Sequence, residues 1–144
     1  MSDIIPIRPS TLSDKSWKKS VNFRFSLGEL SCPLSLQEVP RIVADMPLGF
    51  VKSEAGLSII GILGLQKNRN LFVGNDGRWL GQNVPSFLGT YPFLLAENES
   101  AQDQLVFCIN EASGLISEDK DNIPFFDEQG ELSVELKEIL HFLE

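Results

Sequence analysis

Apolar residues along the chain fall into short runs that predict strands joined by turns. Residues 21–26 alternate apolar and polar side chains, which is the period of a half-buried strand with the inward positions Val21, Phe23 and Phe25. Residues 49–51 and 57–65 predict two more strands, and the second, which is almost entirely apolar, is expected to be buried on both faces. A strand of that kind is expected to lie in the centre of a sheet.

Two hairpins are predicted further along the chain. The short apolar run 71–73 is followed by Asp76-Gly77, a dipeptide typical of a type I′ turn. Residues 93–95 and 104–109 predict a second pair of strands, joined by the polar, acidic residues 97–103. Antiparallel pairing is therefore expected to dominate.

A helix is indicated after residue 35. Ser35 and Glu38 have the spacing of a capping box, and apolar residues follow at helical intervals. Pro40 lies within this segment, so either the helix is kinked there or it begins at Pro40 as a first-turn residue. Pro47 ends the segment, and residues 85–90 predict one further helical turn.

The C-terminal part combines an acidic loop with an amphipathic helix. Residues 110–130 are predicted to be loop, anchored in the interior by Phe125 and Phe126. The helix that follows has one apolar stripe, and Phe142 points away from it. A protein partner or self-association is expected through this helix, at Leu132, Leu136, Ile139, Leu140, Phe142 and Leu143.

Together these elements predict an α+β fold, a mainly antiparallel sheet with two or three helices packed on it, including the C-terminal amphipathic helix. Residues 1–20 contain prolines and scattered Ser and Thr without apolar periodicity, and are expected to form an irregular N-terminal arm. Residues 21–144 are expected to form a single domain, since 144 residues are enough for one core.

Charge narrows the range of partners. The formal net charge is −8, and residues 73–144 hold three Lys and Arg against fourteen Asp and Glu. Such a chain is repelled by phosphate backbones and anionic lipid, so neither nucleic-acid binding nor membrane insertion is expected. The N-terminal residues lack a signal-peptide pattern. Cytoplasmic residence is therefore expected, with the cell surface, reached by a signal-independent route, as the alternative.

Few residues are suited to catalysis. The sole histidine, His141, lies at a helix end, and Cys32 and Cys108 are widely separated and are expected to be buried free thiols. The acidic residues between Asp119 and Glu131 do not match a calcium-binding loop. No catalytic residue, metal or cofactor is predicted from these patterns.

One aromatic and basic cluster is a candidate binding site: Arg78, Trp79, Tyr91 and Phe93. Arg and Trp are favoured at interface hot spots. A structural role for Trp79 and Tyr91, with the indole N–H or the phenol O–H bonded to the backbone, is the competing interpretation.

The order of these segments resembles the bacterial SapC family, named for proteins linked to a paracrystalline surface layer. The resemblance covers residue 21 to the C-terminus, and its most specific elements are Asp76-Gly-Arg-Trp79 and Tyr91-Pro-Phe93. Weaker elements are Pro47-Leu-Gly-Phe50-Val51, Gly61-Ile-Leu-Gly64-Leu65 and Pro124-Phe-Phe126-Asp127. Asn83 replaces the tyrosine usual in the family. Members are typically longer, which implies a truncated chain, a compact variant, or a partner that covers the terminal helix.

The resemblance implies no catalytic residues, cofactor or substrate. The sequence therefore favours a non-catalytic binding or accessory protein of the cell envelope or surface layer. The alternative is an enzyme, or an accessory of one, that acts on a peptide or saccharide through carboxylates and Arg78.

Overall fold

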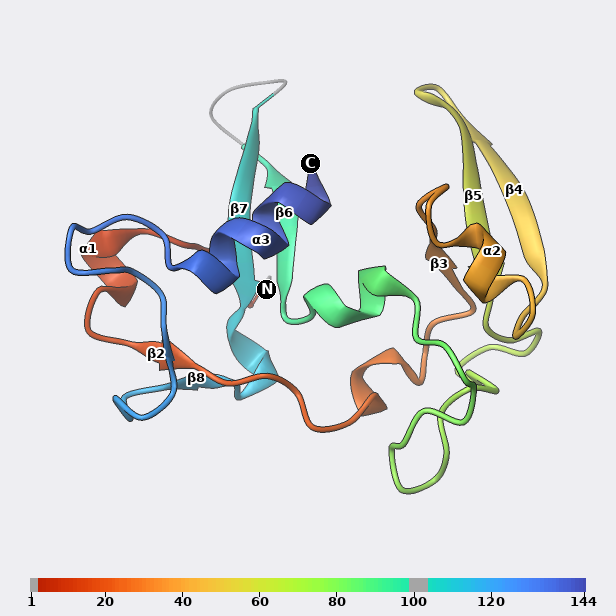
Figure 1. Ribbon diagram of the computed structural model, residues 1–144, viewed down its shortest axis with the longest axis horizontal. Coiled ribbons are helices and arrows are strands. Elements are labelled where there is room, and N and C mark those ends of the chain that lie inside the picture. The colour runs from red at the N-terminus through yellow and green to blue at the C-terminus, as the bar shows by residue number, and fades with distance from the viewer. Residues whose placement is uncertain (1–2, 99–103) are drawn as a thin grey trace. The chain divides into compact units, whose positions relative to one another are not determined.

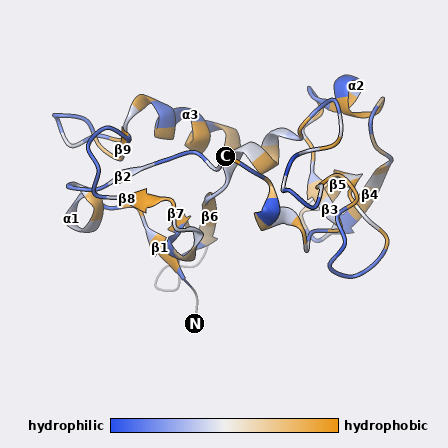
Figure 2. Cartoon of the chain, turned by 90° about the horizontal axis from the view of Figure 1, so that it is seen from below, coloured by the Kyte–Doolittle hydropathy of each residue, from blue (hydrophilic) through white to orange (hydrophobic). Residues whose placement is uncertain are grey.

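The computed structural model describes residues 3–98 and 104–144, and the chain groups into two compact units. Residues 1–20 and 90–144 form one unit, here called the terminal unit, and residues 21–89 form the middle unit. The α+β class is confirmed, but the strands form three small antiparallel sheets and not one large one. Figure 1 labels the helices and most of the strands, and Figure 2 also labels β1 and β9. A single domain over 21–144 stays a prediction.

The terminal unit contains two of these sheets. The first has the order β1-β7-β6, with strands Ile4–Pro6, Leu105–Asn110 and Phe93–Glu97. The second has the order β8-β2-β9, with strands Ile116–Ser117, Ser16–Trp17 and Ile123–Pro124. The helices of this unit are α1 (Pro9–Leu12) and α3 (Val134–Leu143), and a 3-10 turn spans Glu111–Ser113. The predicted pairing of β6 with β7 is confirmed, whereas residues 99–103 of the predicted connecting loop lie outside the described residues.

Large apolar side chains fill the core of the terminal unit. Trp17, Phe93 and Phe125 are almost fully buried, and the Trp17 and Phe93 rings meet edge to face with centroids 4.7 Å apart. Leu136 of α3 joins the same core with no exposed surface. Figure 2 shows hydrophobic residues along β6, β7 and α3. The predicted interior anchor at Phe125 is confirmed.

The predicted irregular arm is wrong, because residues 1–20 hold β1, α1 and β2. Strand β1 pairs with β7, more than 100 positions away in the sequence, with Ile5 opposite Ile109. Trp17 and Leu12 belong to the core of the terminal unit. A two- or three-residue strand shows no periodicity, so its long-range partner is what defines it.

The middle unit is built on the third sheet, of order β3-β5-β4, with strands Ser31–Pro33, Gly56–Ile62 and Leu48–Ser53. The strand predicted over residues 57–65 corresponds to β5, and its predicted position in the centre of a sheet is confirmed. The short helix α2 (Val39–Ile42) contains Pro40 in its first turn, as one of the two alternatives predicted. Helical turns of the 3-10 type span Arg24–Ser26 and Ser86–Thr90, and the second confirms the turn expected there.

Residues 21–26 do not form the predicted strand. Val21 is 96% exposed, and residues 24–26 are a 3-10 turn. The Asn22 side chain accepts a hydrogen bond from the Arg24 backbone N–H at 3.0 Å, a local bond that competes with strand pairing. Phe23 and Phe25 nevertheless pack against the middle-unit core, so their inward placement is confirmed although the element is not.

The turn at Asn75-Asp76-Gly77 also differs from the prediction. Gly77 donates its N–H to the Gly74 carbonyl at 2.8 Å, and Gly74 donates to the Arg78 carbonyl at 2.8 Å. Gly77 has a φ of 86°, whereas Asp76 is not in the left-handed region. This is a three-residue loop with glycine at the left-handed position, in place of the predicted type I′ turn, which needs positive φ at both central residues.

Both cysteines are buried free thiols, as predicted. Burial raises the pKa of the Cys32 thiol from 9.0 to about 11. The unfolded chain therefore loses this proton at a lower pH than the folded chain. It follows that the free energy of unfolding falls as the pH rises from 9 toward 11, and that the full contribution is present below pH 9.

We expect urea denaturation at successive pH values to show this alkaline loss, and Cys32→Ala to show a smaller loss between pH 9 and 11. The comparison with the variant removes the effect of other groups that titrate in the same range. Identical slopes for the two proteins would contradict the assignment.

No helix in the part of the chain that the structure describes has the length and apolar character needed to cross a membrane.

Candidate functional site

The middle-unit sheet has one face that is covered at one end and open at the other. Register places Cys32, Gly61 and Leu48 in one cross-strand row on this face. Met46 covers the row so closely that a Cβ at Gly61 would lie 2.5 Å from the Met46 sulfur. Ile42 of α2 belongs to the same buried cluster. This end of the face is therefore a packed core.

The next rows toward the β4–β5 turn are open. Leu34 donates its backbone N–H to the Ile59 carbonyl at 3.0 Å, and Ile59 is opposite Phe50, so these three residues form a second row. Phe50 is 67% exposed. Leu57 and Lys52 form the third row, and Leu57 is 68% exposed. The predicted burial of β5 on both faces is wrong in this outer half, because among residues 3–98 and 104–144 no element packs over it as Ile42 of α2 and Met46 do over the first row.

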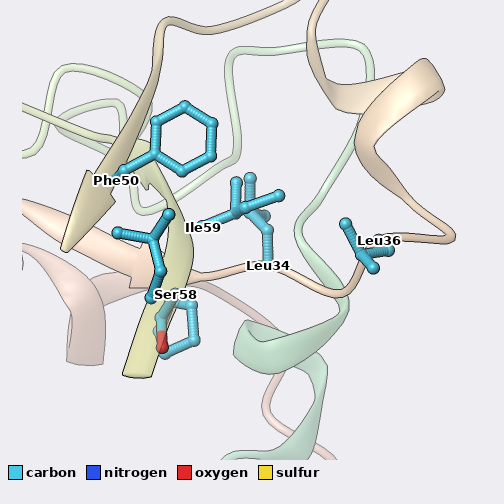
Figure 3. Close-up of a pocket in the computed structure, with 7 residues that line it drawn as sticks. Leu34, Leu36, Phe50, Ser58 and Ile59 are labelled. Carbon is cyan, nitrogen blue, oxygen red and sulfur yellow. The ribbon is translucent and has the colours of Figure 1, made fainter. Parts of the chain in front are cut away.

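These rows line an apolar groove with a volume of about 440 Å³. Figure 3 shows Phe50, Ile59 and Leu34 side by side, with Leu36 across from them on the segment that follows β3. Leu36 is 77% exposed. The residues that line the groove are Pro33, Leu34, Leu36, Phe50, Leu57, Ser58 and Ile59.

A buried carboxylate fixes the segment that carries Leu36. Glu38 is 5% exposed, and its Oε2 accepts hydrogen bonds from the Ser35 hydroxyl at 2.8 Å and the Ser35 backbone N–H at 3.2 Å. Its Oε1 accepts the Ser86 backbone N–H at 2.9 Å, and Arg41 lies 3.8 Å away. The capping-box spacing thus forms a real contact, which holds one wall of the groove in place.

Trp79, one of the predicted site residues, has a structural role. Its indole N–H donates to the Asn83 carbonyl at 3.0 Å, and its ring stacks on Phe72 with centroids 5.3 Å apart. Asn83 in turn donates its side-chain amide to the Arg41 carbonyl. Of the two interpretations of Trp79, the bond from the indole to the backbone is confirmed.

Arg78 pairs with its own turn. Its guanidinium contacts the Asp76 carboxylate, and its backbone N–H donates to the same carboxylate at 3.1 Å. The backbone hydrogen bond, followed by the side-chain bond, lowers the pKa of Asp76. Arg78 is largely exposed, so this pair is a surface contact beside the turn and not part of the groove.

Tyr91 and Phe93 belong to the terminal unit, whereas Arg78 and Trp79 belong to the middle unit. Phe93 is 4% exposed and contacts Trp17, Phe107 and Phe125 within its own unit. Its surface is therefore taken up by core packing. Tyr91 is half-buried. A binding role for the four residues stays a prediction.

The acidic segment is organised by local hydrogen bonds. Asp127 Oδ1 accepts the backbone N–H groups of Gln129 and Glu131, both at 2.9 Å, and Lys137 pairs with Glu131 at 2.9 Å. Among the residues that the structure describes, no three His, Cys, Asp or Glu side chains are grouped so that they could hold a metal ion.

The apolar stripe of α3 faces its own unit. Leu136 is fully buried, and Leu132, Ile139 and Leu143 pack against the same core. Phe142 is 41% exposed, in keeping with its predicted position away from the stripe. Self-association through this helix stays a prediction, and Phe142 is the member of the expected set with the most surface left for it.

Sequence reasoning did not identify the groove. The strands of the hairpin were predicted. Their apolar residues were expected to be buried, because the sequence alone does not show which part of a strand another element covers. No pattern within the two strands records this exposure, because it follows from the greater length of Leu48–Ser53 and Gly56–Ile62 compared with the neighbouring β3 and the four-residue α2.

The family model described as SapC matches residues 9–144, nearly the whole chain, and the protein belongs to the SapC family. No match was found among curated proteins or among solved structures. The elements that carried the resemblance have identifiable positions. Asp76-Gly-Arg-Trp79 forms the loop and the aromatic stack of the middle unit, and Phe93 lies in the core of the terminal unit.

Proposed function

We propose that this SapC-family chain is a non-catalytic binding protein that contacts another protein through the open groove of the β4–β5 hairpin. The observation that carries the proposal is the exposure of Leu36, Phe50 and Leu57 on one continuous apolar surface. The largest contiguous apolar patch on a folded monomer, about 300–600 Å² in extent, is often functional.

The partner belongs, in this proposal, to the bacterial cell envelope or surface-layer machinery. The support is family membership together with the name of the family. Charge is compatible with a protein partner, because the middle unit holds six Lys and Arg against five Asp and Glu and so is almost neutral.

Catalysis through carboxylates and Arg78 is not supported by a particular arrangement of the described residues. Arg78 pairs with Asp76 on an exposed turn. The buried carboxylate of Glu38 is taken up by three hydrogen bonds that hold the chain together.

The groove is tested by the double variant Phe50→Ser with Leu57→Ser, captured with its bound proteins from a native bacterial lysate. Burial of one such side chain stabilises a complex by about 1.5–3 kcal/mol, so we expect binding to weaken by at least tenfold. The free energy of unfolding should change by less than about 0.5 kcal/mol per site, because both side chains are exposed.

Val51→Ser is the matched control, since Val51 lies on the same strand, is 45% exposed and points to the opposite face. Retention of the same proteins by the double variant and by the control would contradict the proposed contact surface.

A further inference from the structure

The outer edge of β4 has backbone groups that pair with no other strand among the described residues. In the part of the chain that the structure describes, β4 is an edge strand whose one neighbour is β5. The Pro47 carbonyl accepts the Ile62 N–H at 2.9 Å, and this bond fixes which alternate residues of β4 form hydrogen bonds with β5. Residues 49, 51 and 53 therefore face β5, and the N–H and C=O groups of Leu48, Phe50 and Lys52 point outward.

The second row of the groove ends at this same edge. Leu34, Ile59 and Phe50 lie on three successive strands. A further strand beside β4 would place a side chain opposite Phe50 and on the same face, because opposite residues in neighbouring strands share a face. An apolar side chain in that position would extend the row and cover the exposed ring.

Lys52 provides a charge on the same face. It lies two residues beyond Phe50 on β4, opposite Leu57, and it is exposed. Within residues 3–98 and 104–144 it takes part in no ion pair. A carboxylate directly opposite Lys52 on an added strand would form a favourable cross-strand pair.

The size of the apolar surface favours a short segment over a large interface. Leu36, Phe50 and Leu57 together expose on the order of 400 Å², given about 150–250 Å² for a large side chain. A stable dimer typically buries about 800 Å² on each partner. The groove is therefore about half the size needed by a second folded copy, and an extended segment can add backbone hydrogen bonds to the contact.

We propose that β4 accepts an extended segment of another polypeptide as a fourth strand, with an apolar side chain opposite Phe50 and a carboxylate opposite Lys52. Backbone bonds along the edge supply affinity, and the groove selects the alternate side chains. This inference rests on the proposed function, because it assigns a mode of binding to the same groove.

The probe is a displayed library of random eight-residue peptides, selected on the full chain. We expect enrichment of peptides with apolar residues at alternate positions and an Asp or Glu two positions from one of them. Selection on the Phe50→Ser, Leu57→Ser variant should not enrich them. Equal enrichment on both proteins would overturn the inference and the proposed function together.

Two substitutions of Lys52 distinguish the contribution of its backbone to peptide binding from that of its side chain. Lys52→Ala removes the charge and should weaken the selected peptides by about two- to fivefold. Lys52→Pro also removes an outward N–H, which edge strands tolerate because it pairs with nothing in the sheet. We expect binding at least tenfold weaker than in Lys52→Ala, because the peptide carbonyl is left unpaired.

Amide hydrogen exchange in the unmodified chain tests, without a variant, whether a bound peptide pairs with the backbone of β4. The amides of Phe50 and Lys52 should exchange at least tenfold more slowly when peptide is bound. The peptides could instead bind through the groove, leave these amides unprotected and bind Lys52→Pro as tightly as Lys52→Ala. That result would overturn the added strand and leave the proposed function standing. Protection of the same amides by concentration-dependent dimerisation without peptide would also overturn it, with a second copy as the occupant.

Discussion

Gly64→Ala is expected to prevent the middle unit from folding stably. A Cβ at this position would lie 2.0 Å from the Arg69 carbonyl oxygen and 3.1 Å from its carbon. Both atoms belong to the backbone, so a change of rotamer cannot relieve the contact. The Leu71 N–H bonds to the Leu63 carbonyl at 2.8 Å next to this contact, so moving the chain apart would also break that bond.

Overpacking usually costs about 1–3 kcal/mol, and a contact with rigid backbone lies at or above the top of that range. We expect thermal unfolding of Gly64→Ala to show a loss of about 3 kcal/mol or more, or no cooperative transition. Gly89→Ala is the matched control, because a Cβ there meets no atom within 4 Å. A stable Gly64→Ala protein, equal to the control, would show that the close approach of residues 64 and 69 is wrong.

Phe125→Ala is expected to have an effect of similar size in the terminal unit. Phe125 has no exposed surface, and its ring meets Phe93 at a centroid distance of 6.5 Å. Truncation removes both the burial and the aromatic contact and leaves a cavity. Phe→Ala substitutions in cores cost about 3–5 kcal/mol, and we expect a value in that range.

Denaturant unfolding measures this loss, and Phe142→Ala is the control, since Phe142 is 41% exposed on α3. The control should lose less than about 1 kcal/mol, because much of its surface is in water already. Equal losses for the two variants would mean that the acidic loop is not anchored by Phe125.

Local signals predicted those elements whose causes are local. The pairing of β6 with β7, the helix α3 and the first-turn position of Pro40 in α2 follow from periodicity, turn residues and the fixed φ of proline. The contact between Ser35 and Glu38 follows from a capping-box spacing. In each case the interacting residues are close in sequence or belong to one hairpin.

Features that depend on distant partners were not predictable in the same way. Trp17 appears in a segment without periodicity, and only its packing on Phe93 makes it a core residue. The alternation at 21–26 suggested a strand, but the Asn22 side chain stabilises a turn. Exposure of Phe50 depends on how far α2 reaches over the sheet, which no pattern within β4 or β5 records.

The central claim is that the groove at Phe50 is where this SapC-family protein contacts its partner. Photo-crosslinking in cells that produce the protein tests it most directly, with a benzophenone amino acid placed at residue 50 or at residue 65. Leu65 is 86% exposed and does not line the groove, so it reports random encounters. We expect a discrete crosslinked product from position 50, weakened by Leu57→Ser, and none from position 65. The absence of a product at position 50, or the same products from both positions, would contradict the account.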